Sequence, residues 1–402
     1  MLGGMLGGGL LGALGLPRGP IPANSAGASE RRFLFIFAAG GWDPTWVFAP
    51  SGGSEHISVD PQGAWSEAGG IGFLDSASRP SVRSFFERYG GLSCVINGFE
   101  IRSVTHERCR RILMTGTPGE GADDWAARIA APTASPLPCL VISGPSYTAQ
   151  HSDVVVRAGE RGQLSGLLDG SALEADGITL PGPEEDRAVE AFLRDRAASL
   201  EAAASAGQEQ RSRAALRAML DQAALVRGLG LDLQSSATGI APVAERARPA
   251  LDALEAGHSR CAVIAHEGQF DVGWDSHTNL QQQSNHFEIL FQDLISITSS
   301  LQQRTGTSGR PLIEEVTLVV CSEMGRTPML NSSGGKDHWT WTSAMLVGAG
   351  VAGGQVVGDY DDHLFGLPVE DRLLTAEDLG ATLLAMADLD PGPLTPIMAA
   401  IA

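Results

Sequence analysis

The sequence FLFIFAAGGWDP, residues 33–44, contains the clearest strand of the chain. It begins with a continuous apolar run, which is typical of a strand that is buried on both faces of a mostly parallel sheet. Gly40 and Gly41 follow this run, and Asp43 lies in the loop that they begin. In open α/β sheets, functional groups gather just past the carboxyl ends of the strands. We therefore expect Asp43 to lie at a functional edge of the sheet.

Similar apolar runs recur along the chain, and helical patterns lie between them. The other expected strands are residues 93–96, 137–143, 261–265, 316–321 and 344–347. The expected helices are residues 105–114, 123–131, 285–301 and 376–387. Strands that alternate with helices predict a three-layer α/β sandwich with a mostly parallel central sheet. Residues 51–72 are rich in Gly and Ser with little periodicity, and they predict an irregular excursion.

Residues 183–257 differ from the rest of the chain, because they are rich in Ala, Arg, Glu and Leu at helical spacing. The spacing predicts a helical hairpin and a third helix over 242–256, inserted between two strands of the sheet. Such an insertion covers the sheet, caps an active site or mediates a homo-oligomer contact, and the sequence leaves these roles open. Residues 31–402 are expected to form a single domain that includes this insertion.

Residues 1–16 form an uncharged, apolar, Gly-rich run, and residues 17–30 supply small residues suited to a signal-peptidase cut. The run is shorter than the roughly 20 apolar residues of a spanning helix and resembles the apolar part of a secretory signal. No basic segment precedes it, so residues 1–30 are interpreted as a truncated export signal, with a flexible tail as the alternative. We expect an exported protein (periplasmic, outer-surface or extracellular) without a transmembrane span.

The charge balance and the cysteines exclude several classes of protein. The 402 residues contain 28 Lys and Arg against 47 Asp and Glu, a formal net charge of −19, and 43% of them are hydrophobic. This hydrophobic fraction is too high for a disordered chain, and the acidic excess argues against a nucleic-acid partner. The five cysteines form no C-x-x-C pair and lie mostly in strand-like runs, so we interpret them as small buried hydrophobic residues.

Carboxylates and imidazoles follow the expected strands in four separate loops. These candidates are Asp43, Asp271, Asp275, His277, Glu323, Asp337 and His338. Carboxylates that lie together without a cation repel one another and raise one another's pKa. Together with imidazoles they suit a divalent ion, with Zn favoured and Mn, Mg or Ca as alternatives. The four loops therefore predict a metal centre. Two ions about 4 Å apart there would stabilise both the attacking oxygen and the leaving oxygen of an ester cleavage.

Three segments carry a resemblance to a known family: VTHERCRRILMTG at 104–116, GWDSHTN at 273–279, and SEMGRTP followed by GGKDHW within 322–339. They resemble the exported bacterial family called domain of unknown function 1501. The similarity extends from Phe33 to TAEDLGATLLAMADLD at 375–390. That family is similar to the alkaline-phosphatase/sulfatase superfamily, so the resemblance implies an alkaline-phosphatase-like, doubly covered sheet with a metal site.

The resemblance also assigns metal ligands by position. Asp275, His277 and His338 match the ligands of a first metal. Asp337 is either a further ligand or the partner that orients His338, and the second role is favoured.

A second metal is implied by the same resemblance. Asp43 and Glu323 match its ligands, and Met324 stands where the superfamily often has a His. This departure leaves the second site one ligand poorer, so the resemblance implies a one- or two-metal centre.

The resemblance places a nucleophile at the N-terminus of a helix, where this sequence has Thr105. A hydroxyl ionised there would attack phosphorus or sulfur, although Thr105 is also suited to serve only as a helix cap. His106 is a candidate ligand, proton donor or scaffold, and Arg326 is a candidate for bidentate binding of the substrate anion. No C-x-[PA]-x-R motif surrounds any Cys, which argues against a formylglycine sulfatase of the usual type.

The predicted function is an exported metal-dependent hydrolase of a phosphate or sulfate ester, with either a small molecule or a polymer as the anionic substrate. Thr105, His106 and Arg326 would be its catalytic residues. The alternative is a non-catalytic, metal-containing exported protein that binds a polymer or a partner. One fold hosts many activities, so the resemblance does not choose between the two.

Overall fold

The computed structural model describes residues 31–49, 54–159, 182–203, 213, 226, 229, 242–268 and 273–402. Its centre is a nine-stranded sheet with the order β12-β4-β11-β8-β1-β7-β5-β6, in which β13 also pairs with β4. The strands are β1 (Arg32–Ala38), β4 (Ser93–Glu100), β5 (Cys139–Val141), β6 (Val155–Arg157), β7 (Cys261–His266), β8 (Val316–Ser322), β11 (Trp341–Gly348), β12 (Gln355–Val357) and β13 (Leu374–Thr375). Only β11 runs antiparallel to its neighbours in this sheet. The prediction of a mostly parallel sheet is confirmed.

The predicted first strand lies at the centre of the sheet. β1 is buried along its whole length, and it pairs in parallel with β7 on one side and β8 on the other. Its last residue, Ala38, is in register with His266 of β7 and Ser322 of β8. The loops that follow these three strands therefore begin side by side at one edge of the sheet.

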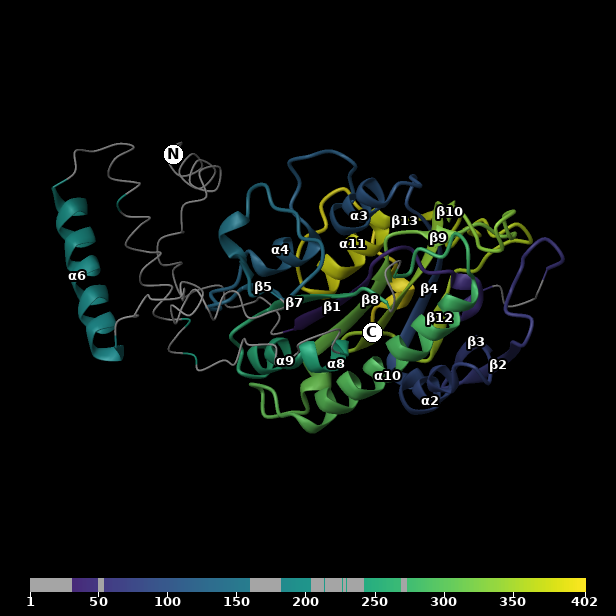
Figure 1. The fold of residues 1–402 in the computed structure, drawn as a ribbon, viewed down its shortest axis with the longest axis horizontal. Coiled ribbons are helices and arrows are strands. Elements are labelled where there is room, and N and C mark those ends of the chain that lie inside the picture. Colours follow the sequence, from purple (N-terminus) through teal and green to yellow (C-terminus); the bar gives the residue numbers. More distant parts are fainter. Residues whose placement is uncertain are drawn as a thin grey trace, which may run out of the picture.

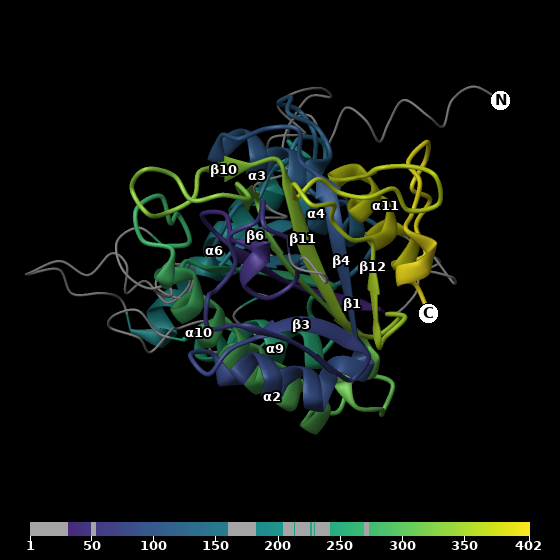
Figure 2. The ribbon, with the colours of Figure 1, turned by 90° about the vertical axis from the view of Figure 1, so that its right-hand side faces the viewer.

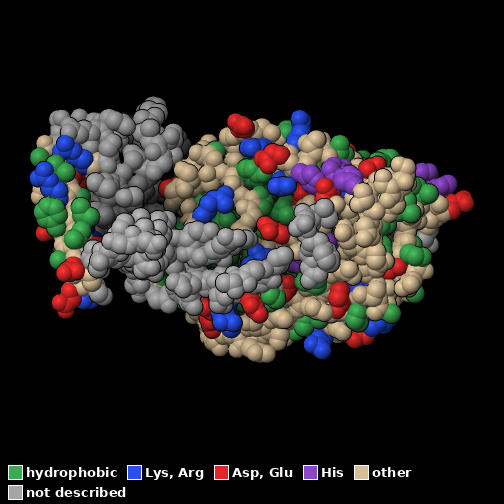
Figure 3. All heavy atoms as spheres, viewed as in Figure 1, with side chains coloured by type: hydrophobic (Ala, Val, Ile, Leu, Met, Phe, Trp, Pro, Cys, Tyr) green, Lys and Arg blue, Asp and Glu red, His purple; other side chains and the backbone are tan. Residues whose placement is uncertain are grey.

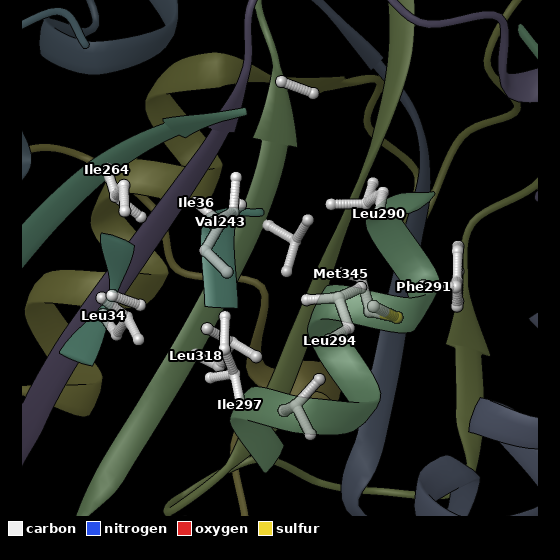
Figure 4. Packing of buried hydrophobic residues seen from close by; sticks show 14 of the residues in the cluster. Leu34, Ile36, Val243, Ile264, Leu290, Phe291, Leu294, Ile297, Leu318 and Met345 are labelled. Carbon is white, nitrogen blue, oxygen red and sulfur yellow. The ribbon is translucent and has the colours of Figure 1, made fainter. Parts of the chain in front are cut away.

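Helices cover both faces of this sheet, which confirms the three-layer architecture (Figures 1 and 2). One face carries α2 (Pro80–Tyr89), α8 (Val243–Arg246), α9 (Arg248–Glu255) and α10 (Gln281–Gln303), and the other carries α3 (His106–Thr115), α4 (Trp125–Ala130) and α11 (Ala376–Met386). Alternate side chains of β1 pack against the helices on the two opposite faces of the sheet. Leu34 and Ile36 belong to the cluster on the face that carries α8 and α10 (Figure 4), whereas Phe33, Phe35 and Phe37 belong to the cluster on the α3 side. Burying each such side chain contributes about 1.5–3 kcal/mol.

Two expectations about local structure were wrong. Residues 51–72 were expected to be irregular, but β2 (Ala64–Ala68) and β3 (Ile71–Asp75) form a hairpin, since Gly69 and Gly70 both adopt the positive φ that a tight turn needs. Residues 242–256 were expected to form one helix but are divided between α8 and α9. Pro249 lies in the first turn of α9, and a proline has no N–H for a helix that would continue through it.

Several expectations lie wholly or partly outside the described residues. Of the insertion over 183–257, α6 (Pro183–Ala202) is helical as expected, but the hairpin and its role stay predictions. The export signal over 1–30 and Asp271 are not described. Within the described part of the chain, no helix combines the length and apolar character needed to cross a membrane. All five cysteines are buried and free, as expected.

Candidate metal centre

Three side chains converge at the carboxyl edge of the sheet. His106 begins α3, Asp275 lies in the loop after β7, and His338 begins the short strand β10 (His338–Trp339), which pairs with β9 (Gly325–Arg326). One potential ligand atom from each lies within 4.8 Å of the other two. Nε2 of His106 is 3.3 Å from Asp275 Oδ2, and Nε2 of His338 is 3.2 Å from Asp275 Oδ1. Histidine side chains form a visible patch on this face of the molecule (Figure 3).

His277 adds a fourth potential ligand to this group. Its Nε2 lies 2.9 Å from Nε2 of His338 and 3.0 Å from Oδ1 of Asp275. The structure therefore brings together the three side chains that were predicted for the first metal, and His106 joins them. We call His106, Asp275, His277 and His338 the histidine cluster.

The outer nitrogen of each ring faces an acceptor. Nδ1 of His338 is 2.7 Å from the carbonyl oxygen of Val104, which can only accept. Nδ1 of His277 and of His106 lie 3.0 Å from carboxylate oxygens of Asp337 and Glu323, respectively. Each ring thus donates its Nδ1–H outward, and in the neutral form its bare Nε2 faces the cluster. This arrangement is common around metal-bound histidines.

With all three rings neutral, the inside of the cluster is a collection of acceptors, and protonation of His106 supplies one donor to Asp275. The Nε2 lone pairs of His277 and His338 face each other and the carboxylate of Asp275, so that only a proton or a cation relieves their repulsion. Hydrogen bonding to Asp275 and then to Glu323 raises the pKa of His106 to about 9. Burial alone would raise the pKa of Asp275, but bonds from His106, His338 and Arg326 lower it strongly. Three imidazoles and one carboxylate fit a divalent ion such as Zn.

Asp43 lies in a different environment. Its side chain is fully buried, with Oδ2 2.8 Å from Nζ of Lys336 and Oδ1 accepting from the amide and the hydroxyl of Thr45. Lys336 is also fully buried and donates to the Thr45 hydroxyl at 2.8 Å. Burial lowers the pKa of Lys336, and the charge of Asp43 opposes this. Asp43 therefore pairs with a cation of the chain itself, and its role as a metal ligand stays a prediction.

Glu323 is buried directly behind the histidine cluster. Its Oε1 accepts from the Gly40 amide at 2.8 Å and from His106 Nδ1, with Arg110 Nε at 3.5 Å. Its Oε2 is buried without a hydrogen-bond partner. In this geometry Glu323 orients His106, which is a different role from the predicted one of metal ligand.

Arg326 is fully buried and bound to the loops. Its guanidinium donates to the carbonyl oxygens of Gly40, Gly41 and Trp274, and at 2.8 Å to Oδ1 of Asp275. These contacts hold Asp275 in place. The predicted role of Arg326 in binding a substrate anion finds no support in this geometry.

Asp337 and Thr105 lie at the exposed rim of the cluster. Asp337 orients a histidine, as favoured, but this histidine is His277 and not His338. Thr105 precedes α3 without a side-chain capping bond, so the alternative role of a simple cap is not observed. Its exposed hydroxyl lies 3.5 Å from the Ser103 hydroxyl. Thr105 directly precedes His106 in the chain.

The glycines beside the ligands allow close approach of the loops. Gly40 has φ +125°, and a Cβ there would lie 2.9 Å from the Asp275 amide nitrogen. At Gly335 a Cβ would lie 2.2 Å from the carbonyl carbon of His277. A side chain at either position would push the ligand loops apart.

Sequence reasoning missed two residues of this region. Gln283 in the first turn of α10 is fully buried, where its Oε1 accepts from the Asp43 amide and its Nε2 donates to Trp274 O and Ser276 Oγ. It joins the loops after β1 and β7. Arg110 follows His106 by four residues and so lies on the same face of α3. Only that spacing could have indicated it.

A cavity of about 290 Å³ lies beside Arg110. It is bounded by α3 and by the loop after β5, with Tyr147 in its wall. Arg110 and Arg157 supply positive charge, and Glu107 and Glu267 supply negative charge. The cavity therefore offers a polar site close to the histidine cluster.

The fold and the cluster together define a class of protein: a three-layer α/β protein with a histidine–carboxylate cluster at the carboxyl edge of its parallel strands. The chain belongs to the family described as Protein of unknown function (DUF1501), whose model matches residues 93–400. The predicted family is thus confirmed. No curated protein matches the sequence.

Solved structures of hydrolases show a weak likeness. A phosphonate monoester hydrolase from Silicibacter pomeroyi is 12% identical over 92% of this chain and 76% of its own, with a TM-score of 0.37. The enzyme of the same name from Agrobacterium radiobacter is 13% identical over 91% and 74%, with a TM-score of 0.33. A Bacteroides thetaiotaomicron protein from a study of the metabolism of multiple glycosaminoglycans is 9% identical over 89% and 73%, with a TM-score of 0.36.

Proposed function

We propose that the chain is an exported metal-dependent hydrolase that cleaves a phosphate or sulfate ester. The observation that carries the proposal is the histidine cluster, in which bare Nε2 atoms of His277 and His338 face the Asp275 carboxylate. These residues would hold the ion, with His106 as the fourth ligand. A divalent ion bound there would act as a Lewis acid on the ester oxygen and lower the pKa of a nearby hydroxyl or water.

Thr105 is the proposed nucleophile. Its hydroxyl is exposed at the start of α3, and the adjacent residue His106 belongs to the cluster. The first N–H groups of a helix have no intrahelical acceptors and favour an anion, so they would help to hold the ester group beside this hydroxyl. The attack would form a bond from Thr105 Oγ1 to phosphorus or sulfur while the bond to the leaving oxygen breaks, and the proton of the Thr105 hydroxyl would pass to the departing alcohol. Water would then cleave the threonine ester and release phosphate or sulfate.

The cavity beside Arg110 would bind the remainder of the substrate. Arg110 and Arg157 line it, and an arginine binds a phosphate or sulfate group through two hydrogen bonds. These residues take over the anion-binding role that sequence reasoning assigned to Arg326. Glu107 and Glu267 would accept hydrogen bonds from hydroxyl groups of the same substrate.

The proposal is tested with three substrates: the nitrophenyl esters of phosphate, phenylphosphonate and sulfate. Turnover of each is measured with Zn, Mn, Mg or Ca added in turn. We expect Thr105→Ala to lower kcat by at least about 100-fold while metal binding is kept, and Thr105→Ser to retain part of the activity. Ser103→Ala is the matched control, because its hydroxyl lies beside that of Thr105. If Ser103→Ala loses activity and Thr105→Ala keeps it, the nucleophile is wrongly assigned.

A non-catalytic, metal-containing protein is the second candidate. It is favoured by Met324, which is fully buried and contributes no ligand of the kind found in the histidine cluster. Bound metal without cleavage of any of these esters would support this candidate and contradict the hydrolase.

A further inference from the structure

The residues that the family resemblance assigns to a second metal are occupied by donors of the chain itself. Asp43 Oδ1 accepts twice from Thr45, and Oδ2, which has no hydrogen bond of good geometry, forms an ion pair with Lys336 Nζ at 2.8 Å. The two charged side chains have no exposed surface. A divalent ion would have to displace a buried ammonium group to reach Asp43.

The other two positions of that site offer little to an ion. Met324 is fully buried where an imidazole would be needed, and a thioether is a poor ligand for Zn, Mn, Mg or Ca. Glu323 has one unpaired oxygen, but its other oxygen is bound to the Gly40 amide and to His106. One carboxylate oxygen does not make a metal site.

The position of Lys336 in the chain explains why an ammonium group lies there. It directly precedes Asp337 and His338, and its amide donates to the Ser276 carbonyl, which lies between Asp275 and His277. Its buried contact with Asp43 therefore ties the loop that carries His338 to the loop after β1. The lysine neutralises Asp43 and positions two elements of the histidine cluster.

We propose that the centre holds one divalent ion per chain and that the Lys336 ammonium group takes the place of a second ion at Asp43. The inference rests on the proposed function only in requiring that the histidine cluster bind a metal. It makes Lys336 and Asp43 positioning residues, since neither touches the proposed substrate.

Metal stoichiometry tests this inference without an activity assay. The full chain is loaded with excess Zn²⁺ or Mn²⁺, exchanged into metal-free buffer, and analysed by elemental analysis and native mass spectrometry. We expect one ion per chain in the wild type and in the double variant Asp43→Asn/Lys336→Met, which removes both buried charges together. The matched control is Arg32→Met/Glu315→Gln, which removes a buried ion pair at the other end of β1.

The outcomes separate the two proposals. Two ions per wild-type chain, with one lost in the Asp43→Asn/Lys336→Met variant, overturn the inference and leave the hydrolase intact. A folded double variant that binds no ion also overturns it, because Asp43 would then belong to the single site. No ion in the wild type contradicts the proposed function itself. Two ions per wild-type chain overturn the inference even if a variant does not fold.

Discussion

Two groups of charged side chains lie at the same edge of the sheet: the buried Asp43, Lys336 and Glu323, and the histidine cluster. The repulsion between neighbouring acceptors is relieved differently in the two groups. In the buried group, each carboxylate has a donor from the chain: Asp43 has Lys336, and Glu323 has the Gly40 amide. In the histidine cluster, the side chains are partly exposed, and several acceptors face one another without enough donors. Burial requires pairing within the chain, whereas an exposed group can take an ion from solution.

Pairing within the chain therefore decides whether a carboxylate is available for function. A sequence motif places both groups beside the ends of strands, but only the cluster has unsatisfied acceptors directed at a common point. Arg326 lies between the two groups, because it donates to Asp275 from a fully buried position.

Removing the charge of Asp275 should have the largest effect, because this carboxylate touches all three histidines of the cluster. We expect Asp275→Asn to weaken Zn binding by more than about 100-fold, beyond the effect usual for residues that only orient ligands. Competition with a chromophoric chelator measures the affinity. Asp390→Asn, at an exposed carboxylate, is the control, and an equal affinity in both variants would contradict the assignment of the cluster.

Breaking the buried pair should destabilise the fold. Lys336→Met leaves Asp43 buried without its cation, which is expected to cost about 3–5 kcal/mol of unfolding free energy. Urea unfolding of the apo protein measures the loss. The second substitution Asp43→Asn should restore most of it, since a buried pair can be replaced by neutral groups at little cost. If Lys336→Met is as stable as the double variant, the pair is not what neutralises Asp43.

The elements that position these groups were largely predictable from sequence. β1, β7 and β8 were found within a residue at either end, because a buried parallel strand is a continuous apolar run. β4 was predicted to end at Ile96 but continues to Glu100. A glycine such as Gly98 is typical of a turn in the sequence. In the structure Gly98 has a positive φ and lies at a shift of register within the β4–β11 pair. Local composition does not distinguish a bulge from a turn.

The partners within the site were less predictable, because they depend on contacts between distant segments. The sequence indicated that Asp275, His277 and His338 share an edge, since each follows a strand or a tight turn. It did not indicate that Arg326 would be buried among backbone carbonyls, or that Gln283 would join the loops after β1 and β7. Such pairings follow from side-chain packing between loops, which no spacing rule along the chain encodes.

Asp124 extends the comparison to a buried carboxylate that accepts hydrogen bonds from backbone amides and has no cation beside it in the described residues. It accepts from the amides of Ala127 and Tyr147, so it holds the loop that walls the cavity. Burial raises its pKa to about 6, although these bonds act to lower it. The native state therefore holds the proton of the Asp124 carboxyl more tightly than the unfolded chain does. The contribution of this proton to the free energy of unfolding is complete below about pH 4 and is lost as pH rises through 6.

The substitution Asp124→Asn removes this titration. Relative to the wild type, we expect the variant to gain roughly 1–3 kcal/mol of unfolding free energy as pH rises from 4 to 7. Urea unfolding at four pH values measures the difference, with Asp390→Asn as the exposed control. A difference that stays constant with pH would show that Asp124 is not protonated in the native state above pH 4.

The smallest effect is expected at the rim of the cluster, where Asp337 orients His277 through a 3.0 Å contact with Nδ1. Asp337 is exposed, so water can replace part of its role, and Asp337→Asn should weaken Zn binding by only about tenfold, the low end for an orienting residue. Thr105→Ala, which leaves every histidine contact in place, is the control in the same chelator assay. A loss as large as that of Asp275→Asn would mean that Asp337 binds the ion directly. No loss would mean that Val104 and Glu323, which orient His338 and His106, are sufficient to hold the cluster in shape.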